Sequence, residues 1–534
     1  MRLRVLLGKR FRWKSWGALL LVASGLHFVS FDIRRQPIAT DIDYYLYYAR
    51  QSARGELPYV DYFEHKTPLG IYTGVWLYRL GEILGTDLLY SIRVGYLILA
   101  GLAAAVMGVV FVRLYNNRPA AGWIGLLVYC GFSMLGLMPC IGNLPKMIGL
   151  LCAGAAMLAV YARRWFWAGL LVGIAGMDWQ PCGALAALGV FLAGAWGSDR
   201  MVRWLKLAAG MVLPAVAFSF YFAARGALGI FWKMVLLMSL TKAASDPLSF
   251  SDRCRKMWEY VLHDCPGETW LLVLGAAGII LYGIRLVRMR RTSLAPMMVG
   301  LGAYHYGMII FSLVDFQGHG DVFVLLASWA FFAAVPVAEG YYYLLRLKRR
   351  FRGRVARSYG PVLGVLVVTA LVVACRPSFL RMGWRYNSPL LGWSDYELDS
   401  QRQAAERFFQ VVGDRDFALV RNQELLFLGK GECPLPFVTW NQGTYVHYRQ
   451  GDEDRVDTLS RLLRQEDLDF IVLPKTWLPY LRGTAFAPWL LVNYAPIMIS
   501  SQDEKYYVIV WVHRRVPPPA VRGVRYIEIE SLWI

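Results

Sequence analysis

The sequence predicts an α-helical polytopic membrane protein with about eleven transmembrane helices and a C-terminal α/β domain outside the cytoplasm. Apolar residues make up 57% of the 534 positions and charged residues 18%, whereas a soluble domain carries about 25% charged residues. The apolar residues gather in long uncharged runs, such as 361–375, which recur along the first 375 positions. A soluble core could bury one or two such runs, so their repetition excludes a soluble globular protein.

Each expected transmembrane helix is one of these runs. We expect helices at 15–31, 92–114, 119–138, 146–161, 165–177, 181–196, 204–224, 269–287, 296–314, 322–345 and 360–375. The first follows a basic N-terminus and resembles a signal peptide. No small-residue cleavage site follows it, so we interpret it as a retained span. The segments 165–177 and 181–196 are short, which leaves open one broken hairpin in place of two full spans.

The basic residues predict the orientation of the chain. Lys and Arg lie at the N-terminus and in every second connection, whereas the connections 139–145, 178–180 and 315–321 contain none. The basic side is cytoplasmic by the positive-inside rule, so an odd number of helices places the C-terminal domain in a bacterial periplasm. The net charge of +20 is therefore explained by a protein of the bacterial inner membrane, in contact with membrane lipids and without nucleic acid.

The chain divides into a transmembrane domain, residues 1–375, and a soluble domain, residues 376–534. Two long loops of the first domain, 32–91 and 225–268, also lie outside. In the second domain we expect helices at 396–412 and 454–464 and strands at 417–420, 470–473 and 505–512. This domain contains no Gly-rich phosphate loop, HExxH or GxSxG motif. The eight cysteines lack CxxC spacing, which argues against a zinc framework and leaves Cys254 and Cys265 as candidates for one disulfide.

The first exterior loop has the most informative pattern. Asp41 and Asp43 precede a Tyr-rich helix expected at 44–54, and a second amphipathic helix is expected at 69–84. Two surface helices with carboxylates near their starts fit a site that recognises a lipid headgroup. An Asp at a helix start is also a good N-cap, so both interpretations of these aspartates stay open at this point.

This loop resembles the GT-C superfamily of membrane glycosyltransferases, in particular the lipid A aminoarabinose transferase and the protein O-mannosyltransferases. Their first motif has an acidic residue, Tyr four positions on and Ala-Arg eight positions on, which here are Asp41, Tyr45 and Ala49–Arg50. Their second motif, FEKPPL-like, is matched by Phe63, Glu64, Lys66, Pro68 and Leu69, with His65 inserted. The resemblance implies a GT-C-like transmembrane domain.

The resemblance also implies an activity. Such enzymes transfer a sugar from a polyprenyl-phosphate carrier to a lipid, glycan or protein acceptor on the exterior face. A carboxylate of the first loop would be the general base. Asp41 is the first candidate because its spacing to Tyr45 and Ala49–Arg50 fits the motif, whereas that of Asp43 does not. Asp43 stays the second candidate because the usual acidic pair is altered here, with Ile42 between the two acids.

Phosphate is a competent leaving group, so the protein mostly has to position the donor and neutralise its charge. Lys66 or Arg50 would provide that positive charge. Tyr45, Glu64 and His65 complete the substrate-binding set that the resemblance implies for this loop.

A second polar cluster lies in the sequence DFQGHGD between two apolar helices. Its candidate substrate-binding residues are Asp315, Gln317, His319 and Asp321. A polar hairpin that satisfies helix ends would look the same, but the resemblance favours a place in the active site. No cofactor is required, although Glu64, His65 and His319 are candidate ligands of a divalent metal ion.

Further polar residues lie in short turns on the same side. Asn143, Lys146, Asp178 and Gln180 are candidates to line the same cavity. Glu339, near the cytoplasmic end of its helix, is expected to pair with a nearby arginine.

Two other functions compete with a glycosyltransferase. A transporter or flippase would show repeated halves, or a helix broken near its middle by Gly and Pro with buried charge, and the hydropathy pattern predicts neither. A non-catalytic scaffold would leave the acidic, aromatic first loop unexplained.

Overall fold

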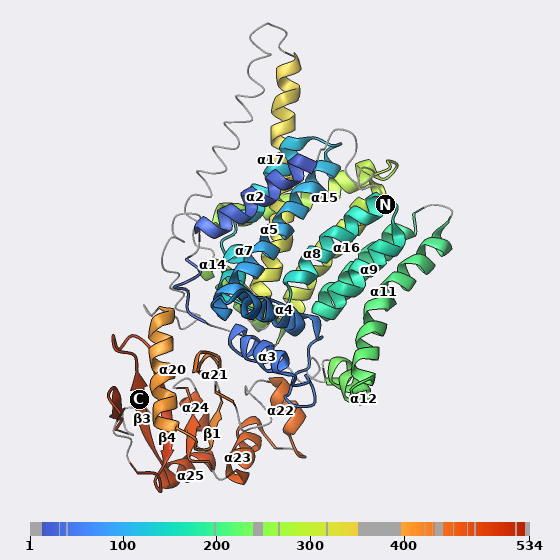
Figure 1. The fold of residues 1–534 in the computed structure, drawn as a ribbon. Helices are drawn as coiled ribbons and strands as arrows, with labels where there is room; N and C mark the ends of the chain where they lie inside the picture. The colour runs from blue at the N-terminus through green and yellow to red at the C-terminus, as the bar shows by residue number, and fades with distance from the viewer. Residues whose placement is uncertain are drawn as a thin grey trace.

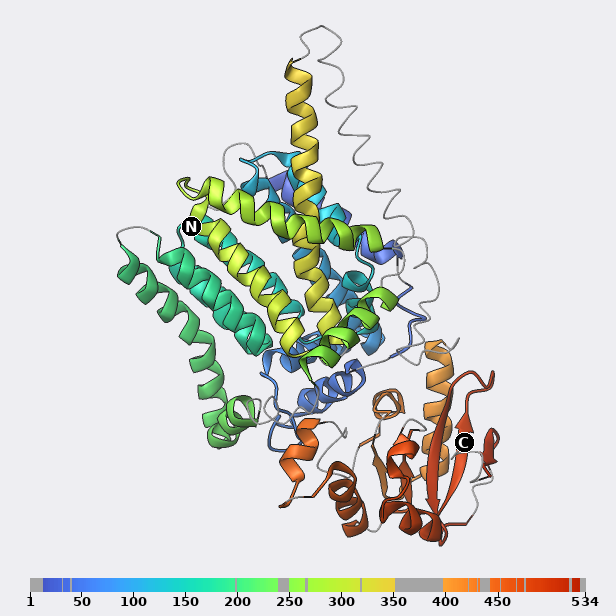
Figure 2. The same cartoon turned by 180° about the vertical axis from the view of Figure 1, so that it is seen from behind.

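The computed structural model describes residues 13–30, 32–38, 41–196, 199–238, 249–264, 268–316, 319–350, 397–420, 422–429, 431–432, 442–451, 453–466, 468–474, 477–517 and 521–528. It is mostly helical, at 71%. A bundle of long helices makes up the larger part, and a smaller group of helices and strands from the C-terminal third lies at one end of it (Figures 1 and 2).

The elements that the structure describes before residue 351 are all helical. They are α2 (Trp13–Ser30), α3 (Ile42–Arg54), α4 (Leu69–Leu84), α5 (Leu88–Leu114), α6 (Pro119–Cys130), α7 (Met134–Ile141), α8 (Met147–Tyr161), α9 (Trp165–Asp178), α10 (Gln180–Gly194), α11 (Arg200–Ala223), α12 (Leu228–Trp232), the π-helix η1 (Lys233–Met238), α14 (Phe250–Asp264), α15 (Thr269–Met289), α16 (Ala295–Val314) and α17 (His319–Arg350). Every expected span from 15–31 to 322–345 is helical, with one exception described below, and the span expected at 360–375 lies outside the described residues.

Several helices have the length and composition of membrane spans. Among the described residues, 5 helices are long and apolar enough to cross a membrane: α5, α11, α15, α16 and most of α17. The bent pair α6–α7 makes this up to 6, and further apolar helices, such as α8, α9 and α10, are shorter. These helices fit a multi-pass membrane protein, while the count of about eleven spans stays a prediction.

The helix expected at 119–138 is the exception, because the structure divides it into α6 and α7. The two halves are bent by 60°. At the break, the buried carboxylate of Glu268 accepts a hydrogen bond from the main-chain N–H of Ser133 at 2.9 Å, which satisfies a donor at the start of α7. The expectation of one continuous helix at 119–138 was therefore wrong, because the carboxylate that stabilises the break comes from a distant part of the sequence.

Small residues allow the helices to pack closely. A Cβ atom at Gly169 of α9 would collide with the carbonyl oxygen of Leu207 in α11, and one at Gly210 of α11 would collide with that of Phe166. Such close contact of helix backbones is typical of membrane bundles. Glu339 of α17 pairs with Arg285 of α15, as expected from the sequence.

The C-terminal elements form a small five-stranded sheet with helices around it. They are α20 (Leu398–Val412), β1 (Phe417–Leu419), α21 (Glu424–Gly429), α22 (Gln442–Tyr448), α23 (Arg455–Gln465), β2 (Phe470–Val472), α24 (Leu478–Leu481), α25 (Phe486–Asn493), β3 (Tyr494–Ser500), β4 (Tyr507–His513) and β5 (Val524–Tyr526). The strand order is β1-β2-β4-β3-β5, with β1 parallel to β2 and the other pairs antiparallel. The sequence predicted α20, α23, β1, β2 and β4 but not β3, although β3 pairs with β4 along its whole length.

The segment 32–91, expected as the first exterior loop, lies where the bundle meets the C-terminal elements. Both views show α3 between the long helices and the group that contains α20 and α21 (Figures 1 and 2). The second expected exterior loop contains α12, η1 and α14. Cys254 lies in α14, whereas Cys265 lies outside the described residues, so the disulfide stays a prediction.

Candidate active site

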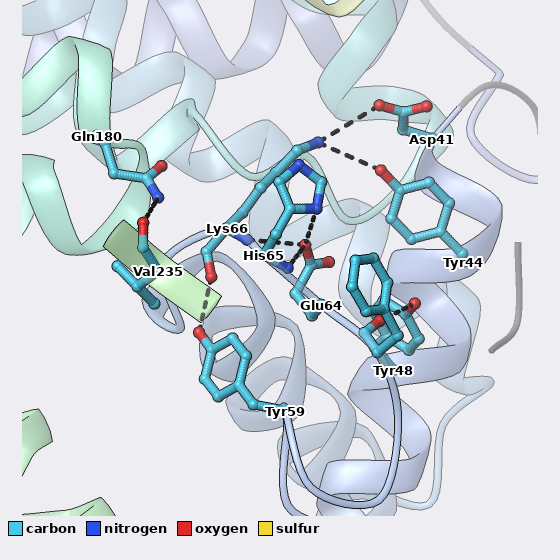
Figure 3. A network of polar contacts seen from close by, with 10 residues as sticks. Asp41, Tyr44, Tyr48, Tyr59, Glu64, His65, Lys66, Gln180 and Val235 are labelled. Atoms are coloured by element: carbon cyan, nitrogen blue, oxygen red, sulfur yellow. Dashed lines mark hydrogen bonds and ion pairs between the residues drawn. The ribbon is translucent and has the colours of Figure 1, made fainter. Parts of the chain in front are cut away.

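Asp41 and Asp43 use their carboxylates differently. Asp41 is the N-cap residue of α3, but its side chain makes no capping hydrogen bond. Its side chain is 70% exposed, and its Oδ2 atom lies 3.5 Å from Nζ of Lys66 (Figure 3). Asp43 instead accepts a hydrogen bond from the main-chain N–H of Tyr44 at 2.6 Å. The capping interpretation therefore does not explain Asp41, whose carboxylate faces a cation.

Lys66 connects the two motifs of the first loop. Besides its ion pair with Asp41, its Nζ donates a hydrogen bond to the hydroxyl of Tyr44 at 3.2 Å. The same atom lies 5.0 Å from the ring centre of Tyr45, within the range of a cation–π interaction. A lysine ammonium has three donors, so these two polar contacts leave it the capacity to bind a further anion.

Glu64 stabilises the main chain of the second motif. Its side chain is buried, and its Oε1 accepts hydrogen bonds from the main-chain N–H groups of His65 and Lys66 at 2.7 and 2.9 Å. Nδ1 of the His65 ring lies 3.4 Å from the same oxygen. The Glu64 carboxylate thus stabilises the turn that contains Lys66.

Two buried tyrosines also fix this turn. Tyr59 donates its hydroxyl to the carbonyl of Lys66 at 2.7 Å, and Tyr48 of α3 donates to the carbonyl of Phe63 at 2.7 Å (Figure 3). Burial raises the pKa of the Tyr59 hydroxyl well above its usual value, so it stays protonated and able to donate. Burial, and to a smaller extent the Asp41 charge, likewise raises the pKa of Tyr44.

The second polar cluster comes together around Lys146. Its Nζ lies 2.8 Å from Oδ1 of Asp321 and 4.6 Å from the ring centre of Trp179. Its main-chain N–H donates to Oδ2 of the buried Asp178 at 3.1 Å. Three connections that the sequence placed on one side of the membrane therefore meet in space, at the ends of α8, α9 and α17.

The remaining residues of the DFQGHGD segment are described only in part. Asp315 caps the C-terminal end of α16, and its main-chain N–H donates to Phe311. Gln317 lies outside the described residues, and His319 begins α17 with its side chain outside the description. Substrate binding by this segment stays a prediction.

The turn before α8 links this cluster to the first loop. Asn143 donates to the carbonyl of Tyr45 at 3.1 Å, and it is fully buried. A Cβ atom at Gly70, in the first turn of α4, would collide with Pro145. Gln180 donates to the carbonyl of Val235 at 3.3 Å.

Arg50 is directed to the C-terminal elements. Its buried guanidinium donates to the carbonyls of Leu426 at 2.8 Å and Phe427 at 3.5 Å, and also to that of Gly431. In the structure, Arg50 therefore binds main-chain carbonyls of the C-terminal elements, whereas the motif implied a contact with phosphate.

A metal site is not evident in the described part of the chain. No group of three or more His, Cys, Asp and Glu side chains that could hold a metal ion lies there. Of the candidate ligands Glu64, His65 and His319, the first two are neighbours, while the side chain of the third is not described.

The sequence did not reveal the residues that anchor the loop. Arg93 of α5 is fully buried and donates to the carbonyls of Ile33 and Gln36 at 2.7 Å each, and to that of Ile141 at 2.8 Å. A lone arginine within an apolar helix was the available signal, because such a charge needs buried partners.

The comparisons with known proteins concern the whole fold. No protein-family model and no curated protein matches the chain. Among solved structures, ArnT from Cupriavidus metallidurans bound to undecaprenyl phosphate is similar with a TM-score of 0.55 and 17% identity, over 95% of this chain and 100% of that one. The apo state of the same protein has a TM-score of 0.54 and 16% identity, over 93% of this chain and 98% of that one.

An archaeal protein has the same architecture. The Archaeoglobus fulgidus oligosaccharyltransferase, tethered with an acceptor peptide, matches with a TM-score of 0.52 and 12% identity, over 98% of this chain and 77% of that one. Both similar proteins belong to the GT-C superfamily. The chain has the GT-C fold. The resemblance first seen in one loop is thus confirmed at the level of the fold, over nearly the entire chain.

Proposed function

We propose that the protein is a GT-C glycosyltransferase that transfers a sugar from a polyprenyl-phosphate carrier to an acceptor on the extracytoplasmic face of the membrane. The observation that supports it most is the contact of Lys66 with Asp41 and Tyr44. A cation able to bind phosphate lies beside an exposed carboxylate able to accept a proton. A glycosyl transfer from a sugar phosphate needs both groups: a cation for the leaving phosphate and a carboxylate that takes the acceptor proton.

Lys66 would bind the donor phosphate. Its ammonium is held by Tyr44 and by the turn that Glu64 and Tyr59 fix, so little reorganisation is needed when an anion arrives. In the transition state, negative charge grows on the phosphate as the bond to the sugar breaks. A preorganised ammonium stabilises that charge.

Asp41 would be the general base. The acceptor O–H or N–H group forms a bond to the anomeric carbon while the bond from this carbon to the phosphate oxygen breaks. The acceptor proton passes to the Asp41 carboxylate, and polyprenyl phosphate leaves. The exposure of Asp41 suits this role because an acceptor can reach it, and its contact with Lys66 places it next to the leaving group.

Asp43 is the second candidate for the base. Its carboxylate is engaged by the N–H of Tyr44 and less exposed than that of Asp41, which favours Asp41. Around this centre, Asp321 and Lys146 form a second charged pair, connected to α3 through the hydrogen bond of Asn143 to Tyr45. We propose that this pair contacts the sugar of the donor.

The test is transfer by the purified protein in lipid nanodiscs. We expect it to consume a polyprenyl-phosphate sugar, releasing polyprenyl phosphate, when membranes of the producing cell supply the acceptor. Nucleotide sugars should not replace this donor. Transfer from a soluble nucleotide sugar, or movement of a labelled lipid across the bilayer without cleavage of its sugar–phosphate bond, would contradict the proposal; the second outcome would indicate a flippase.

A further inference from the structure

The chain that enters α3 is held by one side chain of the C-terminal part. Gln401 of α20 accepts a hydrogen bond from the main-chain N–H of Ile38 at 2.7 Å and donates one to the carbonyl of Ile38 at 2.9 Å. Both residues are buried, with exposed fractions of 1%. Ile38 precedes Asp41 by three positions, so this amide pair fixes the main chain at Ile38, close in sequence to the proposed base.

The chain that follows Asp41 is held in the same way from α21. Arg50 lies two turns into α3 and binds the carbonyls of Leu426, Phe427 and Gly431. These carbonyls lie at or just beyond the C-terminal end of α21, where the last carbonyls lack partners within the helix and carry partial negative charge. A guanidinium has several donors in one plane, so it can satisfy more than one of these oxygens at once.

The contacts of Gln401 and Arg50 are buried, which distinguishes them from an ion pair at the surface. Arg54, one turn after Arg50, pairs with Glu432 at 2.8 Å, but the two side chains are 43% and 67% exposed. An exposed pair of this kind contributes little because water competes for both charges. Loss of Arg50 or Gln401 would instead leave buried main-chain groups without partners, which is costly.

We propose that the C-terminal domain is a positioning element of the active site, in which Gln401 and Arg50 fix the main chain on both sides of Asp41 and so hold its carboxylate against Lys66. Neither residue touches the reacting atoms, so both are positioning residues. The proposal rests on the proposed function, because it requires that Asp41 takes part in the reaction. It also assigns a role to an arginine that the motif alone would place on the phosphate.

The test compares matched substitutions on the same two helices. Gln401→Met and Arg50→Met remove the contacts to Ile38 and α21. Gln403→Met, in the same helix α20, removes only a bond to the main-chain N–H of Gln502, and Arg54→Met removes only the exposed pair. Each variant is assayed as the full-length protein in nanodiscs, for kcat and for the donor KM.

We expect kcat to fall by about tenfold or more in Gln401→Met and Arg50→Met, because a displacement of about 1 Å at the reacting groups is enough for such a loss. The donor KM should change much less, since Lys66 and its turn stay in place. Gln403→Met and Arg54→Met should keep the kcat of the unmodified protein. Arg50→Lys, which keeps one charged donor, should restore part of the loss.

Hydrogen exchange gives a readout independent of activity. The main-chain amides of the first turns of α3 should exchange faster in Gln401→Met than in Gln403→Met, while those of α4 should not differ. If Gln401→Met does not fold, Arg50→Met is compared with Arg54→Met in the same measurement, because it removes the contacts on the other side of Asp41.

The possible failures are distinguishable. Normal kcat in Gln401→Met and Arg50→Met, with an inactive Asp41→Asn, would overturn the positioning role and leave the proposed function standing. Equal losses in the test and control variants would also overturn it. An active Asp41→Asn would instead contradict the proposed function itself.

Discussion

Replacement of Asp41 by Asn separates catalysis from stability. Asn has nearly the same size as Asp and is an equally good N-cap, but its amide does not accept a proton. In the structure the Asp41 side chain makes no capping hydrogen bond. It forms an ion pair with Lys66, and the Asp41 side chain is 70% exposed. Exposed pairs contribute about 1 kcal/mol or less, so we expect the free energy of unfolding to change by no more than this.

The effect on turnover should be much larger. Loss of a general base lowers the rate by about a hundredfold or more, which corresponds to about 2.7 kcal/mol in the activation barrier. The catalytic effect therefore exceeds the stability effect clearly enough for one assay to separate them. The measurement is kcat with a polyprenyl-phosphate sugar at saturating concentration, together with thermal unfolding in the same nanodiscs.

Two matched variants complete this experiment. Asp61→Asn alters another exposed carboxylate of the same loop, which accepts a hydrogen bond from the N–H of Leu57 at 2.6 Å, and it should leave kcat unchanged. Asp43→Asn tests the second candidate. A normal rate in Asp41→Asn with an inactive Asp43→Asn would show that the base is Asp43. Normal rates in both would refute the assignment of catalysis to this loop.

The remaining predictions concern the cations and the orientation. Lys66→Met should raise the donor KM by about ten- to a hundredfold, the equivalent of one hydrogen bond to a charged group, and an unchanged KM would remove Lys66 from the donor site. Lys146→Met should lower the free energy of unfolding by about 3 kcal/mol because it removes the ammonium that pairs with the largely buried carboxylate of Asp321. The double variant Lys146→Met with Asp321→Leu should recover most of this loss, and an equal loss in both would show that the pair is not coupled. A phosphatase fused after residue 534 should be active, because that residue is predicted to lie outside the cytoplasm. If the phosphatase fusion is inactive and a green fluorescent protein fused at the same position is fluorescent, the orientation is the reverse of the predicted one.

Local elements could be predicted closely because their signals lie within them. The helix expected at 69–84 is found as Leu69–Leu84, since Pro68 precedes it and Gly85 ends it with a positive φ of 62°. The apolar runs likewise become helices near their expected limits, because a backbone in an apolar surrounding must satisfy its own hydrogen bonds. The break between α6 and α7 was missed because its stabilising partner, Glu268, lies far along the chain.

Contacts between distant segments could not be predicted in this way. Lys66 and Asp41 are 25 positions apart, and Lys146 and Asp321 are 175 apart. Periodicity and spacing describe which face of an element is apolar, but they do not say which charges meet across elements. The motif resemblance placed Asp41 and Lys66 in one loop, and only the packing of α3 against the turn at Glu64 placed their charges together.

Arg50 shows this division most clearly. By itself the sequence determined that a cation, Arg50, lies on the Tyr-rich helix after Asp41 and outside the long apolar runs. Only the tertiary structure decided which oxygens it binds, because the carbonyls of α21 lie some 376 positions along the chain and reach Arg50 only when the C-terminal elements pack against α3. Sequence sets the chemistry of a side chain, whereas its partner depends on packing that no local pattern contains.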